Sequence, residues 1–213
     1  MEGVLPQLPD IPAPGLMGTP CLARRLSVKC ESSSVAAMTN RTVFLDRDGV
    51  INRVVFRDGK PGSPRQASEF EIEAGVGESL ERLRAAGFKL FVVSNQPDVA
   101  RGLLRIEALN VMTDKIMTTL AVDAVRVCPH DDRDGCDCRK PEPGMLLELA
   151  REHHLDLAES WLIGDSCKDT MAGRAAGCET IILDRPYNHD APGDRRVSDL
   201  REAVEIILAE SVK

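Results

Sequence analysis

The sequence reads VFLDRDGVIN from residue 43 to residue 52. Three apolar residues lead into two carboxylates one residue apart, Asp46 and Asp48, and then into Gly49. The pattern predicts a buried strand with a reactive tip, because ligands of an open α/β sheet bind beyond the carboxyl ends of its strands. D-x-D-G also fits a calcium loop or a plain turn, in which Asp and Gly serve only the backbone geometry.

The spacing of the acidic pair suggests a division of labour. Asp46 is a candidate carboxylate nucleophile that attacks phosphorus, and Asp48 is a candidate general acid that protonates the leaving oxygen and then activates water. Two crowded carboxylates are unfavourable without a cation, and Mg²⁺ prefers oxygen ligands and accompanies phosphate substrates. The tip therefore predicts Mg²⁺-dependent phosphoryl chemistry through an aspartyl-phosphate intermediate.

The composition of the 213-residue chain narrows the function further. This length allows one domain with a tail. The formal net charge of −7 argues against a nucleic-acid partner, since basic patches drive binding to phosphate backbones. No apolar run approaches the roughly 18 residues of a membrane span, so we expect no membrane role. Seven cysteines, an odd number with three beside a histidine, favour a metal site and a reducing, cytoplasmic setting over disulfides.

Residues 1–38 differ in composition from the rest of the chain. Five prolines interleaved with glycine oppose regular structure, and three serines close the segment. We expect a disordered tail over 1–38, followed by one domain over 39–213. Because Met38 directly precedes the first predicted strand, the alternative is that the natural protein begins there.

A second apolar run, residues 88–93, also ends in polar side chains. Ser94, Asn95 and Gln96 follow it directly. A hydroxyl and an amide at a strand tip can hydrogen-bond phosphoryl oxygens and so stabilise the transferring group. We predict substrate contacts here, with a plain turn as the alternative.

A third run, residues 160–163, leads through a glycine into Asp165. Asp165 would complete the cation site with Asp46 and the backbone of Asp48. Asp169, one helical turn later, could order a metal-bound water. The alternative is a helix N-cap at Asp165 followed by a second acid in the first turn.

A short hydrophilic loop carries three cysteines and one histidine, namely Cys128, His130, Cys136 and Cys138. This donor set is what a closed tetrahedral zinc site requires, and four protein ligands leave no position for a catalytic water. Zn²⁺ would therefore be structural and would staple a loop that has no core of its own. Uncoordinated thiols are the alternative.

Arg139 and Lys140 follow the last of these cysteines directly. Held by the stapled loop, Lys140 would neutralise phosphate as a point charge, and Arg139 could make a bidentate contact. A solvated basic pair is the alternative.

The rest of the chain alternates between apolar runs and helical periodicity, which predicts an α/β sheet. Polar and turn residues near 50–64 predict a hairpin or flap beside the active strand. We expect further strands at 121–127 and 179–183 and Cys167 and Cys178 as small buried residues. The expected helices are 75–86, 105–120, 143–153, one ending at 177, and 197–208.

The four strand-tip motifs make the chain resemble the haloacid dehalogenase superfamily of phosphohydrolases over roughly residues 40–185. More narrowly, it is similar to D-glycero-D-manno-heptose 1,7-bisphosphate phosphatases and the related histidinol-phosphate phosphatases. The segments that carry this likeness are FLDRDGVIN at 44–52, SNQ at 94–96, ARG at 100–102, CPH at 128–130 and CDCRKP at 136–141.

The resemblance implies a Mg²⁺-dependent phosphomonoesterase with a Rossmann-like parallel sheet, helices on both faces and no large cap domain. The implied roles are Asp46 as nucleophile, Asp48 as acid/base, Asp46, Asp48 and Asp165 as Mg²⁺ ligands, Ser94 and Lys140 on the phosphoryl group, Arg139 on the substrate, and Cys128, His130, Cys136 and Cys138 as Zn²⁺ ligands.

The favoured substrate is a small phosphorylated metabolite, a heptose bisphosphate that loses its 7-phosphate, and we expect a monomer. Asn52 and the PGML run at 143–146 resemble the heptose enzymes. The five-residue gap between His130 and Cys136 resembles the histidinol-phosphate enzymes, and residues 53–57 depart from the heptose pattern. Histidinol phosphate or another sugar phosphate is therefore the alternative substrate. A noncatalytic zinc-stapled module that binds a metabolite or a protein is the alternative of another class.

Overall fold

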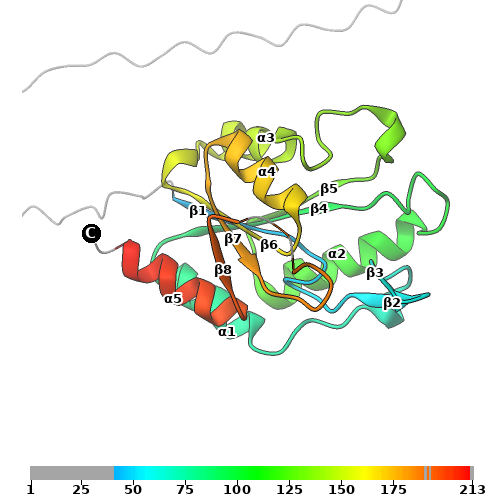
Figure 1. Ribbon diagram of the computed structural model, residues 1–213, viewed down its shortest axis with the longest axis horizontal. Helices are drawn as coiled ribbons and strands as arrows, with labels where there is room; N and C mark the ends of the chain where they lie inside the picture. Colours follow the sequence, from blue (N-terminus) through cyan, green and yellow to red (C-terminus); the bar gives the residue numbers. More distant parts are fainter. Residues whose placement is uncertain (1–40, 190, 192, 212–213) are drawn as a thin grey trace, which may run out of the picture. The chain divides into compact units, whose positions relative to one another are not determined.

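The computed structural model of the protein describes residues 41–189, 191 and 193–211. Six parallel strands form one sheet in the order β5-β4-β1-β6-β7-β8 (Figure 1). Their bounds are β1 (Thr42–Leu45), β4 (Lys89–Asn95), β5 (Ala124–Cys128), β6 (Trp161–Gly164), β7 (Glu179–Leu183) and β8 (Arg195–Val197). Parallel neighbours need long crossover connections, which helices supply along the chain from β1 to β7, whereas a loop joins β7 to β8. The predicted α/β fold with a parallel sheet is confirmed.

β1 lies at the centre of the sheet, and all four of its residues are buried. Val43 and Leu45 pack on one face and Phe44 on the other, because successive side chains of a strand alternate. β4 pairs with one edge of β1 and β6 with the other. The strand order therefore reverses at β1, which is where an open α/β sheet forms its ligand crevice.

Helices cover both faces of this sheet, as predicted (Figure 1). On the face of Val43 lie α1 (Val76–Ala85), α2 (Ile106–Leu120) and α5 (Leu200–Glu210). On the face of Phe44 lie α3 (Gly144–His153) and α4 (Cys167–Ala176). Each helix turns an apolar stripe to the sheet; in α2 the stripe is Leu109, Met112, Ile116 and Leu120.

A two-stranded antiparallel hairpin, β2 (Val55–Arg57) and β3 (Lys60–Gly62), follows the tip of β1. Asp58 and Gly59 turn the chain with positive φ, so the predicted hairpin is confirmed. This hairpin is the only sheet besides the main one in the described residues. Three short 3-10 helices, η1 (Ala67–Glu69), η2 (Asp132–Asp134) and η3 (Leu157–Glu159), lie in the connecting loops.

Two expectations about the second half of the chain were wrong. Val197 ends strand β8 instead of starting the last helix, which begins at Leu200 after the N-cap Asp199. β8 pairs in parallel with β7, and its two arginines give no apolar alternation that could announce a strand. Cys178 is buried as expected, whereas Cys167 is exposed because it opens α4 at the surface.

Two further predictions concern the ends and the setting of the chain. The predicted tail, 1–38, lies outside the described residues, and the domain boundary at residue 39 stays a prediction. In the part of the chain that the structure describes, no helix combines the length and the apolar character that a membrane crossing needs.

Candidate active site and zinc centre

A cleft of about 980 Å³ lies at the carboxyl ends of β1, β4 and β6. Asp46, Asn95, Lys140 and Asp165 line it, together with residues of the β2–β3 hairpin and of the loop after β7. Polar side chains that are far apart in the sequence therefore meet at the carboxyl-terminal end of the sheet.

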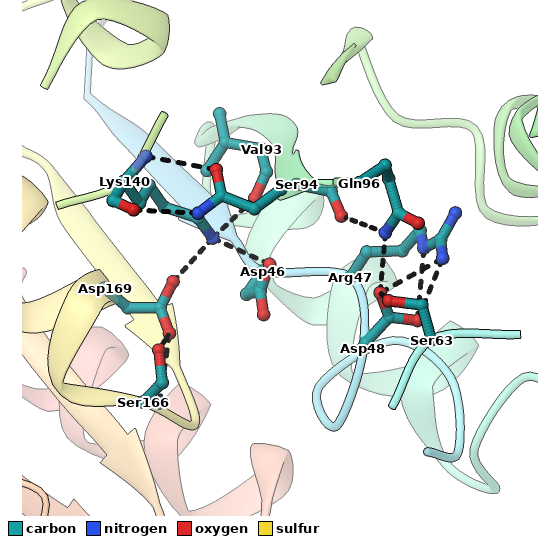
Figure 2. Close-up of polar contacts among 11 residues, drawn as sticks. Asp46, Arg47, Asp48, Ser63, Val93, Ser94, Gln96, Lys140, Ser166 and Asp169 are labelled. Carbon is teal, nitrogen blue, oxygen red and sulfur yellow. Dashed lines mark hydrogen bonds and ion pairs between the residues drawn. The ribbon is translucent and has the colours of Figure 1, made fainter. Parts of the chain in front are cut away.

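Lys140 ties two of these tips together (Figure 2). Its Nζ donates to Asp46 Oδ1 at 2.7 Å, to Asp169 Oδ1 at 2.5 Å and to the carbonyl oxygen of Val93 at 2.8 Å. Burial alone would lower the pKa of Lys140, but Asp169 and Asp46 raise it, so the ammonium group stays charged. Lys140 is thus a fixed, buried cation, and the alternative of a solvated side chain is wrong for it.

Three carboxylates crowd together beside this lysine. Carboxylate oxygens of Asp46, Asp165 and Asp169 lie within 4.8 Å of one another. Burial raises the pKa of Asp46 well above its usual range, and Asp169 and Asp165 add to this against the opposing effect of Lys140. Burial and the charge of Asp169 likewise raise the pKa of Asp165 to about 6. One lysine does not balance three crowded acids, so these oxygen donors fit a hard divalent cation such as Mg²⁺.

The Asp48 carboxylate is not part of this trio and accepts hydrogen bonds from four side chains, of which Figure 2 labels Arg47, Ser63 and Gln96. They are Arg47 at 3.0 Å, Asn52 at 2.9 Å, Ser63 at 2.8 Å and Gln96 at 2.7 Å, all donating. Burial alone would raise the pKa of Asp48, but the charge of Arg47 and the hydrogen bond from Asn52 lower it below its usual range. Asp48 is therefore ionised in the resting site, and its predicted contact with the metal through the backbone stays a prediction.

The residues at the tip of β4 form hydrogen bonds with the candidate catalytic groups and with one another. Ser94 and Gln96 are almost fully buried, and Gln96 Nε2 donates to Ser94 Oγ at 2.8 Å as well as to Asp48. The Asn95 amide donates to the carbonyl oxygen of Lys140 at 2.8 Å and accepts from the Lys140 N–H at 3.0 Å. These side chains connect the candidate catalytic groups, and their predicted substrate contacts stay predictions.

The first turn of α4 explains why Asp165 is free to face the cleft. Ser166 is the N-cap, and its N–H and hydroxyl donate to Asp169 Oδ2 at 3.0 and 2.6 Å. The alternative in which Asp165 caps the helix is therefore wrong. Gly49 lies against Asp165 with φ +84°, and a Cβ on it would lie 2.0 Å from Asp165 Oδ2. Only glycine fits at this position of the active tip.

The predicted zinc ligands form one cluster at the end of β5. The Cys128 Sγ lies 3.5 Å from His130 Nδ1 and 3.7 Å from Cys136 Sγ, and Cys138 Sγ lies 3.3 Å and 3.4 Å from the same two atoms. In a zinc tetrahedron with Zn–S bonds of about 2.3 Å, ligand atoms are roughly 3.4–3.8 Å apart. The four groups fit Zn²⁺ as a structural ion.

The three thiols of this cluster lie so close together that they shift one another's pKa values. Burial raises the pKa of Cys138, and the neighbouring thiols of Cys128 and Cys136 raise it further. Burial alone would also raise the pKa of Cys136, but hydrogen bonds from the two other thiols lower it to about 7. Zinc binds thiolates, so it would remove this conflict.

Arg139 lies between the zinc cluster and the cleft, which it lines. Its guanidinium donates to Asp132 Oδ1 at 2.8 Å and to the carbonyl oxygen of His130 at 3.3 Å. These bonds hold Arg139 in place, so the solvated alternative is wrong for it too; its contact with substrate stays a prediction.

Several contacts of the site were missed from the sequence. Arg47, which pairs with Asp48, is fully buried, although its place between two acids was a signal. Ser63 gave no signal, because its contact with Asp48 depends on how the hairpin folds back. Tyr187 Oη donates to Asp165 Oδ2 at 2.6 Å, and the signal available was that it is the single tyrosine of the chain.

Comparison with known proteins gives consistent likenesses. Residues 137–203 match a family model of HAD-hydrolase-like proteins. The D-glycero-β-D-manno-heptose-1,7-bisphosphate 7-phosphatase of Bordetella bronchiseptica is 39% identical over 183 residues, which are 80% of this chain and 99% of that protein. The enzyme of the same name from Escherichia coli K12 is 34% identical over 169 residues, 74% of this chain and 85% of that protein.

A solved structure agrees with these sequence likenesses. It is the crystal structure of D,D-heptose 1,7-bisphosphate phosphatase from B. bronchiseptica complexed with magnesium and phosphate. It matches with a TM-score of 0.71 and 34% identity, and the match covers 80% of this chain and 99% of that one.

Proposed function

Since this chain belongs to the D-glycero-β-D-manno-heptose-1,7-bisphosphate 7-phosphatase family of haloacid-dehalogenase-like phosphatases, we propose that it removes the 7-phosphate of that sugar bisphosphate. The chain is a phosphoric monoester hydrolase. One observation carries the proposal: the buried Lys140 bridges Asp46 and Asp169 beside Asp165, at the point where the strand order of the sheet reverses.

Asp46 is the proposed nucleophile. Lys140 holds Oδ1 of its carboxylate, and Oδ2 attacks phosphorus opposite the departing sugar oxygen. The bond from phosphorus to the sugar oxygen breaks as the bond to Asp46 forms, and water later attacks the same phosphorus and restores the carboxylate. Lys140, and Ser94 through its hydroxyl, stabilise the negative charge of the phosphoryl oxygens.

Asp48 is the proposed acid and base. It delivers a proton to the leaving sugar oxygen and takes one from the attacking water. In the resting site its four donors keep it ionised. The phosphate dianion of the substrate adds negative charge nearby, which raises the proton affinity of Asp48 and favours the acid form when it is needed.

The metals have separate proposed roles. Asp46, Asp165 and the backbone of Asp48 would hold Mg²⁺, with Asp169 adjacent. When bound, Mg²⁺ supplies positive charge that offsets the crowded acids and the phosphoryl oxygens. Zn²⁺ would bind Cys128, His130, Cys136 and Cys138 and stabilise the loop that carries Arg139 and Lys140.

The test is phosphate release with Mg²⁺ from three substrates at matched concentrations, compared by kcat/KM. The substrates are the two anomers of D-glycero-D-manno-heptose 1,7-bisphosphate and histidinol phosphate. We expect at least about a hundredfold preference for the β anomer, which corresponds to roughly 2.7 kcal/mol of transition-state discrimination. The variant Asp46→Asn, assayed in parallel, shows how much phosphate a contaminating phosphatase releases.

A preference for histidinol phosphate would overturn the proposed substrate and make the short gap between His130 and Cys136 the better guide. No release from any substrate by Mg²⁺-loaded protein would favour a noncatalytic binding module. The monomeric state and the cytoplasmic location stay predictions.

A further inference from the structure

The loop between β7 and β8 contacts both acidic tips of the cleft. Arg185 donates through Nε and Nη2 to the carbonyl oxygen of Gly49 at 2.9 and 2.7 Å. Asn188 Nδ2 donates to the carbonyl oxygen of Asp165 at 2.6 Å and to that of Leu183 at 2.9 Å. Two side chains of one loop thus fix the backbone at the tips of β1 and β6.

Tyr187 lies between these two anchors and contacts the Asp165 side chain itself. Its phenol hydroxyl donates to Asp165 Oδ2 at 2.6 Å, and its ring lines the cleft. A carboxylate has two oxygens, so a donor on one of them fixes the plane of the group while the other can bind a cation. Hydrogen bonds of this kind orient metal ligands in proteins and tune how strongly they bind.

The Tyr187 ring is supported from the hairpin. Phe56 of β2 meets it edge to face, with ring centroids 6.0 Å apart and an interplanar angle of 67°. Phe56 is 57% exposed, so its contact with the Tyr187 ring lies at the surface beside the cleft. The Phe56 contact and the Asp165 hydrogen bond together fix both ends of the tyrosine.

We propose that Tyr187 is a positioning residue of the magnesium site, whose hydroxyl holds the Asp165 carboxylate in the orientation that binds Mg²⁺. The inference rests on the proposed function, because it assigns Asp165 to the Mg²⁺ site of the phosphatase. It adds a residue from a loop outside the strand-tip motifs, and it makes that loop part of the metal site.

The variant Tyr187→Phe tests the proposal because it removes one hydroxyl and keeps the ring on Phe56. Mg²⁺ binding is measured by calorimetry on zinc-loaded protein without substrate. We expect the Kd for Mg²⁺ to rise about tenfold or more. Phosphate release should fall at low Mg²⁺ and recover at saturating Mg²⁺, which a merely structural defect would not do. The matched control is Thr118→Val, which removes one hydrogen-bonded hydroxyl from the exposed face of α2 and should leave the Kd unchanged.

A second measurement does not depend on how the variant folds. Tyr187 is the only tyrosine, so protein labelled with 3-fluorotyrosine gives a single ¹⁹F resonance. This resonance should shift during Mg²⁺ titration with the calorimetric Kd. An unshifted resonance, or equal or tighter Mg²⁺ binding by Tyr187→Phe, would overturn the proposal. Wild-type protein that shows the expected Mg²⁺ effects but releases no phosphate from the heptose bisphosphate refutes the proposed substrate and leaves the role of Tyr187 intact.

Discussion

The acidic trio of Asp46, Asp165 and Asp169 and the zinc cluster both hold candidate ligand atoms within 4.8 Å of one another, but they are assembled in different ways. The trio comes from two strand tips and a helix, since Asp46 follows β1 and Asp165 and Asp169 follow β6. The zinc cluster comes from eleven consecutive residues, Cys128 to Cys138. One site depends on the register of the sheet, and the other on a loop that can close around an ion by itself.

The two sites meet at Lys140. The zinc loop ends two residues before it, and the Asn95 side chain clamps its backbone from the tip of β4. The zinc loop, residues 128–138, would therefore fix the position of the Lys140 backbone. Asp46 and Asp169 of the trio bind its ammonium group. The comparison predicts that damage to the trio acts mainly on chemistry, and that damage to the zinc cluster acts mainly through loss of stability.

The largest effect is expected for Asp46→Asn. The amide cannot serve as the nucleophile, so phosphate release should fall by at least about 10³-fold. Zinc content should match that of the wild type and the protein should still unfold cooperatively, because the amide replaces the carboxylate with almost no change in shape. Phosphate release, metal analysis and thermal unfolding measure the three quantities, and retained turnover would refute the assigned nucleophile.

Next in size is the loss of stability in Cys136→Ser. Removing one thiolate should abolish stoichiometric zinc and lower the free energy of unfolding by several kcal/mol, because binding to a structural site contributes folding energy. Activity should fall as well, because less of the protein is folded and because the loop that positions Lys140 loses its ion. The matched control is Cys167→Ser, which changes an exposed thiol outside the cluster. Unchanged zinc content in Cys136→Ser would contradict the zinc assignment.

A smaller effect concerns the pH dependence of stability. The folded pKa of Asp165, about 6, exceeds the usual value of 3.8. The folded state therefore binds this proton more tightly, and stability falls as pH rises from about 4 to 6. Asp165→Asn lacks this titration, so without Mg²⁺ it should gain about 2 kcal/mol over the wild type between pH 4 and pH 7. Urea unfolding in magnesium-free buffer at the two pH values measures the change; a pH-independent difference would contradict it.

An effect of similar size is expected for Asn95→Ala, which breaks the link between the two sites. Loss of both hydrogen bonds to the Lys140 backbone should lower the free energy of unfolding by about 1–3 kcal/mol and kcat by about tenfold, with zinc retained. Unfolding and kinetics on the same preparation measure both. Unchanged kcat would show that the zinc loop alone positions the lysine.

Much of the fold could be predicted, because long apolar runs and helical periodicity are local signals. The hairpin, β7 and the helix pattern follow directly from them. β8 could not be predicted, since a three-residue strand with two arginines forms only because β7 offers it an edge. The environment of Cys167 likewise depends on where α4 begins relative to the cleft.

The candidate site likewise has features that local sequence signals predict and features that depend on tertiary contacts. The sequence alone determined which residues are candidates for the site: the acids at the strand tips, the basic pair, and the predicted zinc ligands, which lie close together in the sequence. Tertiary structure decided which way each carboxylate faces, with Asp48 held by Ser63 and Gln96 and with Asp165 held by Tyr187. These contacts join segments that only sheet pairing and loop packing bring together, and no local pattern in the chain encodes them.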